Sequence, residues 1–369
     1  MLTDRFFKKS TLDMKTIPKV ELHVHLEGTI TPFLIKKLST EYKIPIPKGL
    51  INPHNDQIAW DSFEDFLIKY DTATNVICRK EAMTLITYEY LKQNASNGAI
   101  YCELSVSPDH LAKHKISYQN TVDAVVQGIK QAKKDFDIDA RILIVLVRHL
   151  GSKCCEDLVN TILLNPNEYV VGITLAGNEK LFPPSMFVNA FKKANNGGLK
   201  LTAHAGEFTD SQDVLNAINL LQVTRVGHGI HAAFDENAMN KILKHNIHLE
   251  LCPTSNHSLE THKNYPKKFE HLAYPSHPLS ILHEKGVRYS LNTDDPPFFK
   301  NATLLTEYNY AAKLLDLELK DLLKITLTSL EDSFAPNSLK MELRKKVIDY
   351  SVKNGISDSK SDIKNLLSL

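Results

Sequence analysis

Eight short runs of β-type residues recur along the chain, and each is followed by a longer segment in which apolar residues have helical spacing. This alternation is typical of parallel βα units, and eight such units close an α/β (β/α)8 TIM barrel. Two segments exceed a simple unit: 26–99 is expected to hold several inserted helices, and the tail after Pro296 is expected to be helical. The eight runs are Lys19–His25, Ile100–Val106, Arg141–Val147, Val170–Leu175, Leu199–His204, Thr224–His228, Ile247–Leu251 and Val287–Asn292.

The length favours one enlarged barrel domain, and the balanced charge argues against a nucleic-acid-binding or membrane-binding protein. A TIM barrel typically takes about 250 residues, so the 369 residues are interpreted as one domain, 1–369. Lys and Arg number 44 against 43 Asp and Glu, which leaves no net field to hold a polyanion or a membrane surface. The chain has no apolar run of signal-peptide or membrane-spanning length, and its five cysteines form no C-x-x-C pair. We therefore expect a cytoplasmic protein with no nucleic-acid or membrane partner.

The ends of the first, fifth and eighth runs carry residues that suit a metal ion. Successive strand residues point to opposite faces, so Glu21, His23 and His25 are expected to face the barrel axis together. His204 closes the fifth run with the same parity, and Asp294 follows the eighth, which neighbours the first in a closed barrel. An H-x-H pair or an Asp-Asp-Pro turn is a weak signal by itself. Their expected convergence at the C-terminal strand ends predicts a site for a divalent transition metal.

Two further residues stand beside the expected ligands. Glu207 follows His204 by three residues; it either caps the next helix or lies in the pocket, where desolvation would raise its pKa and let it donate a proton. His228 stands between two glycines, which allow either an exposed turn or the close approach of a ligand. The expected metal cluster favours the catalytic interpretation of both. Most of the remaining histidines, His110 among them, have polar or helix-surface contexts and are expected at the surface.

Five ordered stretches resemble the successive signatures of the adenosine deaminase family, and they span nearly the whole chain. The resemblance implies a zinc-dependent aminohydrolase on the barrel fold that removes the 6-amino group of a purine nucleoside as ammonia. Smaller similarities lie in 103–112 and 175–179. The five stretches are Lys19–Gly28 (KVELHVHLEG), Thr202–Glu207 (TAHAGE), Arg225–Gly229 (RVGHG), Leu251–Asn256 (LCPTSN) and Ser290–Pro296 (SLNTDDP).

The resemblance also implies a role for each matching residue. The ligands of one zinc ion (Zn2+) per chain would be His23, His25, His204 and Asp294. Glu207 would protonate the purine N1, His228 would orient the attacking water and help to deprotonate it, and Asp295 would bond N7. The residues that would contact the substrate are His25, Glu27, Gly177 through its backbone, Asp295, and the pocket-covering Phe66, Leu67 and Tyr70. The spacing of the last three is equally typical of core packing.

Three positions differ from the usual sequence motifs of the family, and these differences affect the prediction of the substrate. Adenosine deaminases usually carry aspartate at the position of Glu27, whereas glutamate there is common in adenine and aminodeoxyfutalosine deaminases. Thr174 and Asn178 also depart from the usual D-L-A-G-D-E text. We predict deamination of adenosine and 2′-deoxyadenosine in purine salvage, with adenine or aminodeoxyfutalosine deamination, or a non-catalytic relative, as alternatives. A cupin-like iron enzyme also carries H-x-H on a strand, but it needs hairpins in place of helical crossovers.

Overall fold

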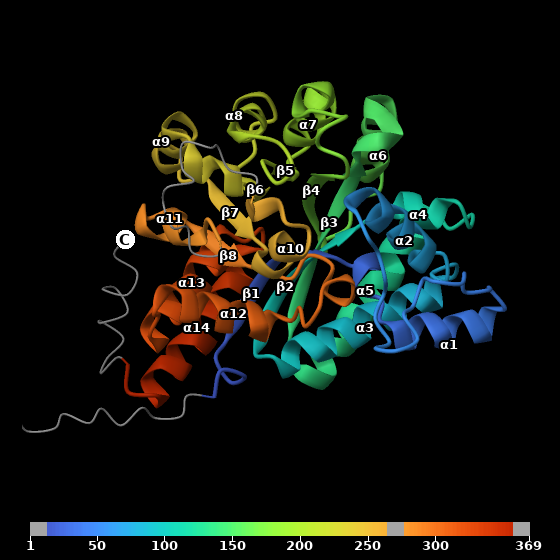
Figure 1. The fold of residues 1–369 in the computed structure, drawn as a ribbon, viewed down its shortest axis with the longest axis horizontal. Helices are drawn as coiled ribbons and strands as arrows, with labels where there is room; N and C mark the ends of the chain where they lie inside the picture. Colours follow the sequence, from blue (N-terminus) through green and yellow to red (C-terminus); the bar gives the residue numbers. More distant parts are fainter. Residues whose placement is uncertain (1–12, 264–276, 357–369) are drawn as a thin grey trace, which may run out of the picture.

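The computed structural model describes residues 13–263 and 277–356, and its strands form one eight-stranded parallel sheet in the order β1 to β8 (Figure 1). Each strand pairs in parallel with the next one along the chain. The predicted barrel is confirmed, and the predicted runs differ from the strands by at most two residues at an end. The strands are β1 (Lys19–His25), β2 (Ala99–Val106), β3 (Asp139–Val147), β4 (Val170–Ala176), β5 (Lys200–Ala205), β6 (Arg225–His228), β7 (His248–Leu251) and β8 (Tyr289–Leu291).

The barrel closes where the chain beyond β8 meets β1. Val24 and Asp294 form an isolated parallel bridge. The backbone N–H of His25 donates to the carbonyl of Asp294 at 2.9 Å, and the N–H of Asp294 donates to the carbonyl of His23 at 3.2 Å. This seam is built from the backbone of three of the predicted metal ligands, so closing the barrel also brings their side chains together.

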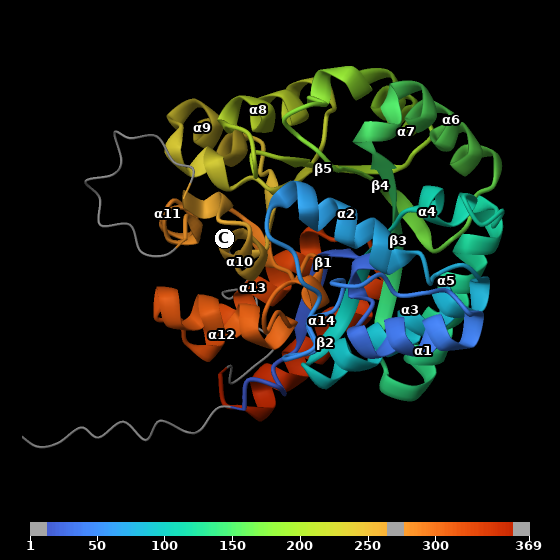
Figure 2. The ribbon, with the colours of Figure 1, turned by 45° about the vertical axis from the view of Figure 1, so that its right-hand side comes forward.

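Helices surround the sheet, and the predicted helical insertion and helical tail are both present (Figures 1 and 2). Among residues 13–263 and 277–356, no helix has the length and apolarity needed to cross a membrane. The α-helices are α1 (Pro32–Tyr42), α2 (Phe63–Thr74), α3 (Lys80–Ser96), α4 (Pro108–Ala112), α5 (Tyr118–Phe136), α6 (Gly151–Leu164), α7 (Val188–Asn196), α8 (Ser211–Leu220), α9 (Glu236–Lys244), α10 (Pro253–Ser258), α11 (Leu279–Glu284), α12 (Leu304–Leu315), α13 (Leu319–Asp332) and α14 (Asn337–Lys353). The short 3-10 helices are η1 (Glu27–Thr29), η2 (Arg148–Leu150), η3 (Pro184–Phe187), η4 (Ile230–Phe234), η5 (Thr261–Lys263) and η7 (Pro296–Phe298).

The insertion between β1 and β2 places α2 across the C-terminal mouth of the barrel (Figure 2). Ser62 begins the helix because its side chain accepts a hydrogen bond from the N–H of Asp65, which satisfies a free helix donor. The ring of Phe66 then packs against Phe298 and Phe299, which follow β8 in the chain. The ring centroids are 5.5 and 5.7 Å apart. These aromatic contacts hold one face of α2 over the strand ends.

The first strand departs from strict alternation. Between Glu21 and Val24, β1 has one residue more than the paired stretch of β2, which is a β-bulge. The carboxylate of Glu21 accepts hydrogen bonds from Tyr90 and Asn94 of α3, both at 2.6 Å. The expectation that Glu21 shares the axial face with His23 is therefore wrong, because the bulge changes which side chains point inward.

The segment between α13 and α14 closes the N-terminal end of the barrel. Apolar side chains of this segment and of the adjoining ends of α13 and α14 pack against β1 and β2, in a cluster of Val20, Leu22, Tyr101, Leu330, Ala335, Leu339 and Leu343. Beside this cluster, the Arg225 guanidinium lies 3.7 Å from the ring centroid of Phe334. The tail is therefore an integral part of the barrel core.

A buried ion network fills the barrel interior around Arg225. Its Nε lies 2.8 Å from Oε1 of Glu250, and its Nη2 lies 2.7 Å from Oε2 of Glu103. The three side chains are at most 1% exposed. Burial alone would raise the pKa of Glu250, but Arg225 and the hydrogen bond from His23 outweigh it and lower that pKa to about 2. The network holds Glu250 ionised beneath the strand ends.

We expect Arg225→Met to destabilise the protein strongly. The variant leaves Glu103 and Glu250 buried without their counter-charge, and breaking a buried pair in this way typically costs about 3–5 kcal/mol. Chemical denaturation followed by circular dichroism measures the free energy of unfolding. The matched control is Lys153→Met, because Lys153 is 82% exposed in its pair with Asp157 and such pairs contribute little. Equal unfolding midpoints for the two variants would contradict a structural role for the buried network.

Candidate active site

A cavity opens at the C-terminal ends of the strands, beneath α2, and it gathers nearly every residue that the sequence predicted for the site. His23 is not one of the residues that line the cavity, and it is 2% exposed. The predicted residues that line the cavity are His25, Glu27, Phe66, Leu67, Tyr70, Gly177, His204, Glu207, His228, Asp294 and Asp295.

The predicted metal ligands converge on one point. Nε2 of His25 lies 3.2 Å from Nε2 of His204. Oδ1 of Asp294 lies 3.4 Å from Nε2 of His25 and 3.5 Å from Nε2 of His23. Within the described residues, Nε2 of His23 has no hydrogen-bond partner although it is buried. Buried imidazole nitrogens converging beside a carboxylate are the donor set that a zinc ion takes in proteins, so these residues fit such an ion.

His228 lies close enough to compete for the same ion. One set of donor atoms within 4.8 Å of one another comes from His23, His204, His228 and Asp294, and a second comes from His25, Asp294 and Asp295. Asp294 belongs to both sets. The geometry therefore brings the four predicted ligands together and adds His228 to their immediate surroundings.

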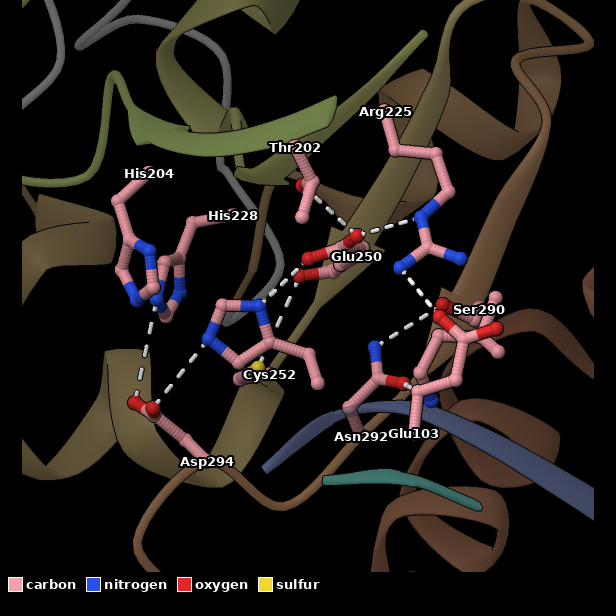
Figure 3. A network of polar contacts seen from close by, with 12 residues as sticks. Glu103, Thr202, His204, Arg225, His228, Glu250, Cys252, Ser290, Asn292 and Asp294 are labelled. Atoms are coloured by element: carbon pink, nitrogen blue, oxygen red, sulfur yellow. Dashed lines mark hydrogen bonds and ion pairs between the residues drawn. The ribbon is translucent and has the colours of Figure 1, made fainter. Parts of the chain in front are cut away.

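Glu250 of β7 orients His23, and the sequence reasoning missed this residue. Its Oε2 lies 2.7 Å from Nδ1 of His23. Thr202 and Arg225 hold its other oxygen at 2.9 and 2.8 Å (Figure 3). A ring nitrogen that donates to a carboxylate leaves the opposite nitrogen free for a metal. Burial lowers the pKa of His23, but the nearby carboxylates of Asp294 and Glu250 outweigh this and raise that pKa to about 10. A glutamate between Leu249 and Leu251 in the predicted strand was the available signal.

Glu207 lies in the cavity and has the properties of a proton donor. Burial raises its pKa well above the ordinary value, and the negative charges of Asp294 and Glu179 raise it further. The carboxylate of Glu179 also fixes the backbone here, because its Oε2 accepts from the N–H groups of Glu207 and Phe208 at 3.2 and 3.1 Å. A protonated carboxyl is thereby held at a fixed place beside the metal donors.

Two residues of the site have a left-handed backbone conformation, which residues other than glycine rarely adopt. His228 has φ of 58° and Asp294 has φ of 63°. This left-handed region is uncommon for residues other than glycine, although Asp and His tolerate it better than most. Such residues cluster at functional sites, where the surrounding fold imposes them. Here the left-handed turns occur where β6 and β8 end, and they set the direction in which these two side chains leave the strand.

Asp295 stands beside Asp294 at the end of β8, and Gly28 makes room for it. A Cβ atom at position 28 would lie 1.7 Å from Oδ1 of Asp295, so the close approach requires glycine. Burial raises the pKa of Asp295 well above its ordinary value, and the charge of Asp294 adds to the shift. Oδ1 has no hydrogen-bond partner in the described chain. The carboxyl is therefore available to a ligand, and its protonated form is a hydrogen-bond donor.

Glu27 is also a buried lining residue of the cavity, and only one of its two carboxylate oxygens has a hydrogen-bond partner in the described chain. Its Oε1 accepts a hydrogen bond from the backbone N–H of Ser107 at 2.8 Å. Oε2 has no partner among the residues that the structure describes, and the side chain is 1% exposed. Burial raises the pKa of this carboxyl. One oxygen is therefore free to bond a ligand.

His110 also lines the cavity, so its predicted surface position is wrong. Its Nε2 lies 3.2 Å from Oδ1 of Asp71, and its ring centroid lies 5.7 Å from that of Tyr70. Both neighbours belong to α2. The sequence could not show this, because the contact depends on α2 folding back over α4.

The stretch after β7 contributes two further residues that sequence reasoning did not place in the site. Oγ of Ser255 donates to Oδ2 of Asp294 at 2.7 Å. Nδ2 of Asn256 donates to Oε1 of Glu207 at 3.2 Å and lies 3.2 Å from Nδ1 of His228. A polar loop with a helix cap would show the same sequence, so only the contacts distinguish the two interpretations.

Known proteins resemble this chain over most of its length. The family model of adenosine deaminase matches residues 18–350. The adenine deaminase of Chelativorans sp. (strain BNC1) is 33% identical over 325 residues, which are 88% of this chain and 96% of that protein. The adenosine deaminase of Xenopus tropicalis is 33% identical over 350 residues, or 90% and 95% of the two chains. A Burkholderia ambifaria amidohydrolase solved with bound Zn has the same fold, with a TM-score of 0.80 at 23% identity and 94% of each chain covered.

The family model covers nine tenths of the chain and the relatives cover most of it at more than 30% identity, in agreement with the barrel and the ordered motifs. The chain therefore belongs to the adenosine deaminase family.

Proposed function

We propose that this chain hydrolyses adenosine and 2′-deoxyadenosine to inosine or deoxyinosine and ammonia, with one zinc ion bound per chain. The observation that carries the proposal is the convergence in one cavity of a His and Asp donor set with Glu207, His228 and Asp295. Relatives named adenosine deaminase and adenine deaminase match the chain equally well, so the family indicates hydrolytic deamination of a purine. The choice of a nucleoside depends on the cavity itself.

The residues of the cavity can perform each step of this hydrolysis. A zinc ion bound by His23, His25, His204 and Asp294 would supply Lewis acidity, which can lower the pKa of water to about 7. Water adds its oxygen to C6 as the carboxyl of Glu207 gives its proton to N1, so that no negative charge accumulates on the ring, and the Glu207 carboxylate then takes the proton that the water loses. Glu207 passes this proton to the amino group, the C6–N6 bond breaks, and ammonia leaves. The C6 hydroxyl returns its own proton to Glu207 and becomes the carbonyl of the product.

The walls of the cavity suit a flat, neutral purine. Val145, Val147 and Ala176 form a small apolar cluster on one side. Phe63, Phe66, Leu67 and Tyr70 of α2 cover the other. Within the described part of the chain, neither Lys nor Arg is among the residues that line the cavity. A phosphate group would lack its usual cationic partners, which favours a nucleoside over a nucleotide.

Glu27 supports a nucleoside over free adenine. Its unpaired Oε2 is an acceptor that a ribose hydroxyl could satisfy and that adenine, which has no sugar, could not. The second candidate is adenine deamination, which the glutamate at position 27 and the adenine deaminase relatives favour. Ammonia release from adenosine, 2′-deoxyadenosine, adenine, methylthioadenosine and aminodeoxyfutalosine at equal concentration separates these functions, and release from none of them would indicate a non-catalytic relative.

We expect about one zinc ion per chain in chelator-washed protein, measured by elemental analysis. His204→Ala should lose zinc, because the cluster loses a ligand that the remaining donors cannot replace. His228→Ala should keep zinc and lose turnover, because its proposed partner is the attacking water. Zinc loss in His228→Ala would instead make this residue a ligand, and a fully active metal-free protein would end the metal hypothesis.

Glu207→Gln tests proton donation to N1. The amide keeps the shape and size of the carboxyl but cannot supply a carboxylic proton, so we expect kcat to fall by about 10²–10⁴. KM and zinc content should change little, since the residue is not a proposed ligand. Steady-state kinetics with adenosine and elemental analysis of the same preparation give both values. Turnover close to that of the wild type would remove Glu207 from the mechanism.

Glu27→Ala tests the nucleoside assignment. A hydrogen bond from a ribose hydroxyl to a carboxylate contributes about 1.5–3 kcal/mol, or about one to two orders of magnitude in kcat/KM. We expect the wild type to prefer adenosine over adenine, and the variant to lose most of that preference while keeping its zinc. Glu27→Asp is the matched control, since it retains an acceptor. A wild-type preference for adenine, or an unchanged ratio in Glu27→Ala, would favour the adenine alternative.

A further inference from the structure

Asn256, on α10, contacts both proposed catalytic residues, Glu207 and His228. One atom, Nδ2, lies 3.2 Å from Oε1 of Glu207 and 3.2 Å from Nδ1 of His228. The side chain is fully buried, and its Oδ1 lies 3.1 Å from Nε2 of His277. This chain of contacts leads from the catalytic pair to the start of α11, and each donor along it can be assigned.

The backbone N–H of Leu279 fixes the proton position on His277. The N–H of Leu279 points to Nδ1 of His277 at 3.0 Å, and a backbone N–H can only donate. Nδ1 of His277 is therefore the acceptor and carries no proton. Burial lowers the pKa of His277 well below its ordinary value, which agrees with a neutral ring. A neutral imidazole with an unprotonated Nδ1 carries its proton on Nε2.

The proton on Nε2 of His277 then fixes the orientation of the Asn256 amide. The atom facing Nε2 must be an acceptor, which is Oδ1. The opposite orientation would set two donors against each other inside the protein, which is costly because both would remain unpaired. The amide nitrogen consequently faces Glu207 and His228, and its two hydrogens supply one hydrogen bond to each.

We infer that Asn256, held by His277, is a positioning residue that keeps His228 in the tautomer with its proton on Nε2. Nδ1 of His228 accepts from Asn256, so the neutral ring has its N–H on the opposite side. There Nε2 lies 3.5 Å from Oε2 of Glu207 and 3.9 Å from Oδ2 of Asp294, two oxygens that can accept a hydrogen bond. The surroundings on both sides of the ring thus agree with the same tautomer.

The inference rests on the proposed function and changes the role of His228 within it. A ring that presents Nε2–H to the cavity donates a hydrogen bond to the attacking oxygen and holds it in place, rather than taking its proton. Asn256 also occupies Oε1 of Glu207, which leaves Oε2 to carry the proton destined for N1. One amide group therefore assigns both the donor atom of the acid and the tautomer of the histidine.

Asn256→Asp is the decisive variant, because a carboxylate of the same shape accepts where the amide donates. We expect Nδ1 of His228 to become protonated and donate to the new carboxylate. In 15N-histidine-labelled full-length protein, two-bond 1H–15N correlation spectra distinguish the two tautomers, and His228→Gln identifies the signal by its absence. The wild type should show the Nε2–H form, with and without zinc, and Asn256→Asp the Nδ1–H form. We expect kcat to fall about 10–100-fold, with little change in KM or zinc content.

His277 variants test the origin of the effect. His277→Gln keeps an N–H near the position of Nε2 and should retain most of the wild-type kcat. His277→Leu removes that donor and should lower kcat toward the value of Asn256→Asp. His262→Gln is the matched control, because His262 contacts the backbone oxygen of Asn256, not its amide, and it should leave kcat unchanged. Thermal melting of each variant checks that folding is intact.

Three results would overturn the inference. These are an Nδ1–H tautomer of His228 in the wild type, a switched tautomer in Asn256→Asp with undiminished kcat, or equal losses in His277→Gln and His277→Leu. The spectra do not require turnover, so they separate this inference from the proposed function. A wild type that deaminates no purine but shows the Nε2–H form would contradict the function and leave the assignment of the tautomer in place.

Discussion

The two backbone hydrogen bonds between Asp294 and the end of β1 are the constraint on which the site depends. They close the barrel and, in the same contact, place His23, His25 and Asp294 side by side. The left-handed backbone of Asp294 turns its carboxylate toward the two imidazoles. A register slip at this seam would separate the donors, so barrel closure and assembly of the proposed metal site are one structural event.

Charge in the barrel is arranged in connected layers. Arg225, Glu103 and Glu250 lie below the strand ends, and Glu250 bonds His23, which is one of the proposed metal ligands. Each buried charge meets an opposite charge or a hydrogen bond, as the cost of desolvation requires. Above this layer, burial raises the pKa of Glu207 and favours its protonated form. Burial thus favours the protonated form of Glu207, whereas Arg225 and His23 keep the equally buried Glu250 ionised.

Much of the fold and of the site could be predicted from local patterns. The βα alternation predicted the barrel, and parity placed His23, His25 and His204 at the axial face without knowledge of any contact. Parity was wrong for Glu21, because a β-bulge depends on pairing with the neighbouring strand, which a single run of residues does not show. Surface placement was wrong for His110, because α2 folds over it from a distant part of the chain.

The sequence by itself determined the alternation of elements, the inward residues of regular strands and the ordered motifs that identify the family. These are local properties, set by side-chain period and residue type. Only the tertiary structure decided the contacts of Glu250 and Asn256, because a buried glutamate in a strand and an asparagine near a helix start are common in many proteins. The role proposed for each depends on which donors and acceptors the closed barrel places within about 3 Å of it, and hydrogen bonding at that range is decided by packing in space.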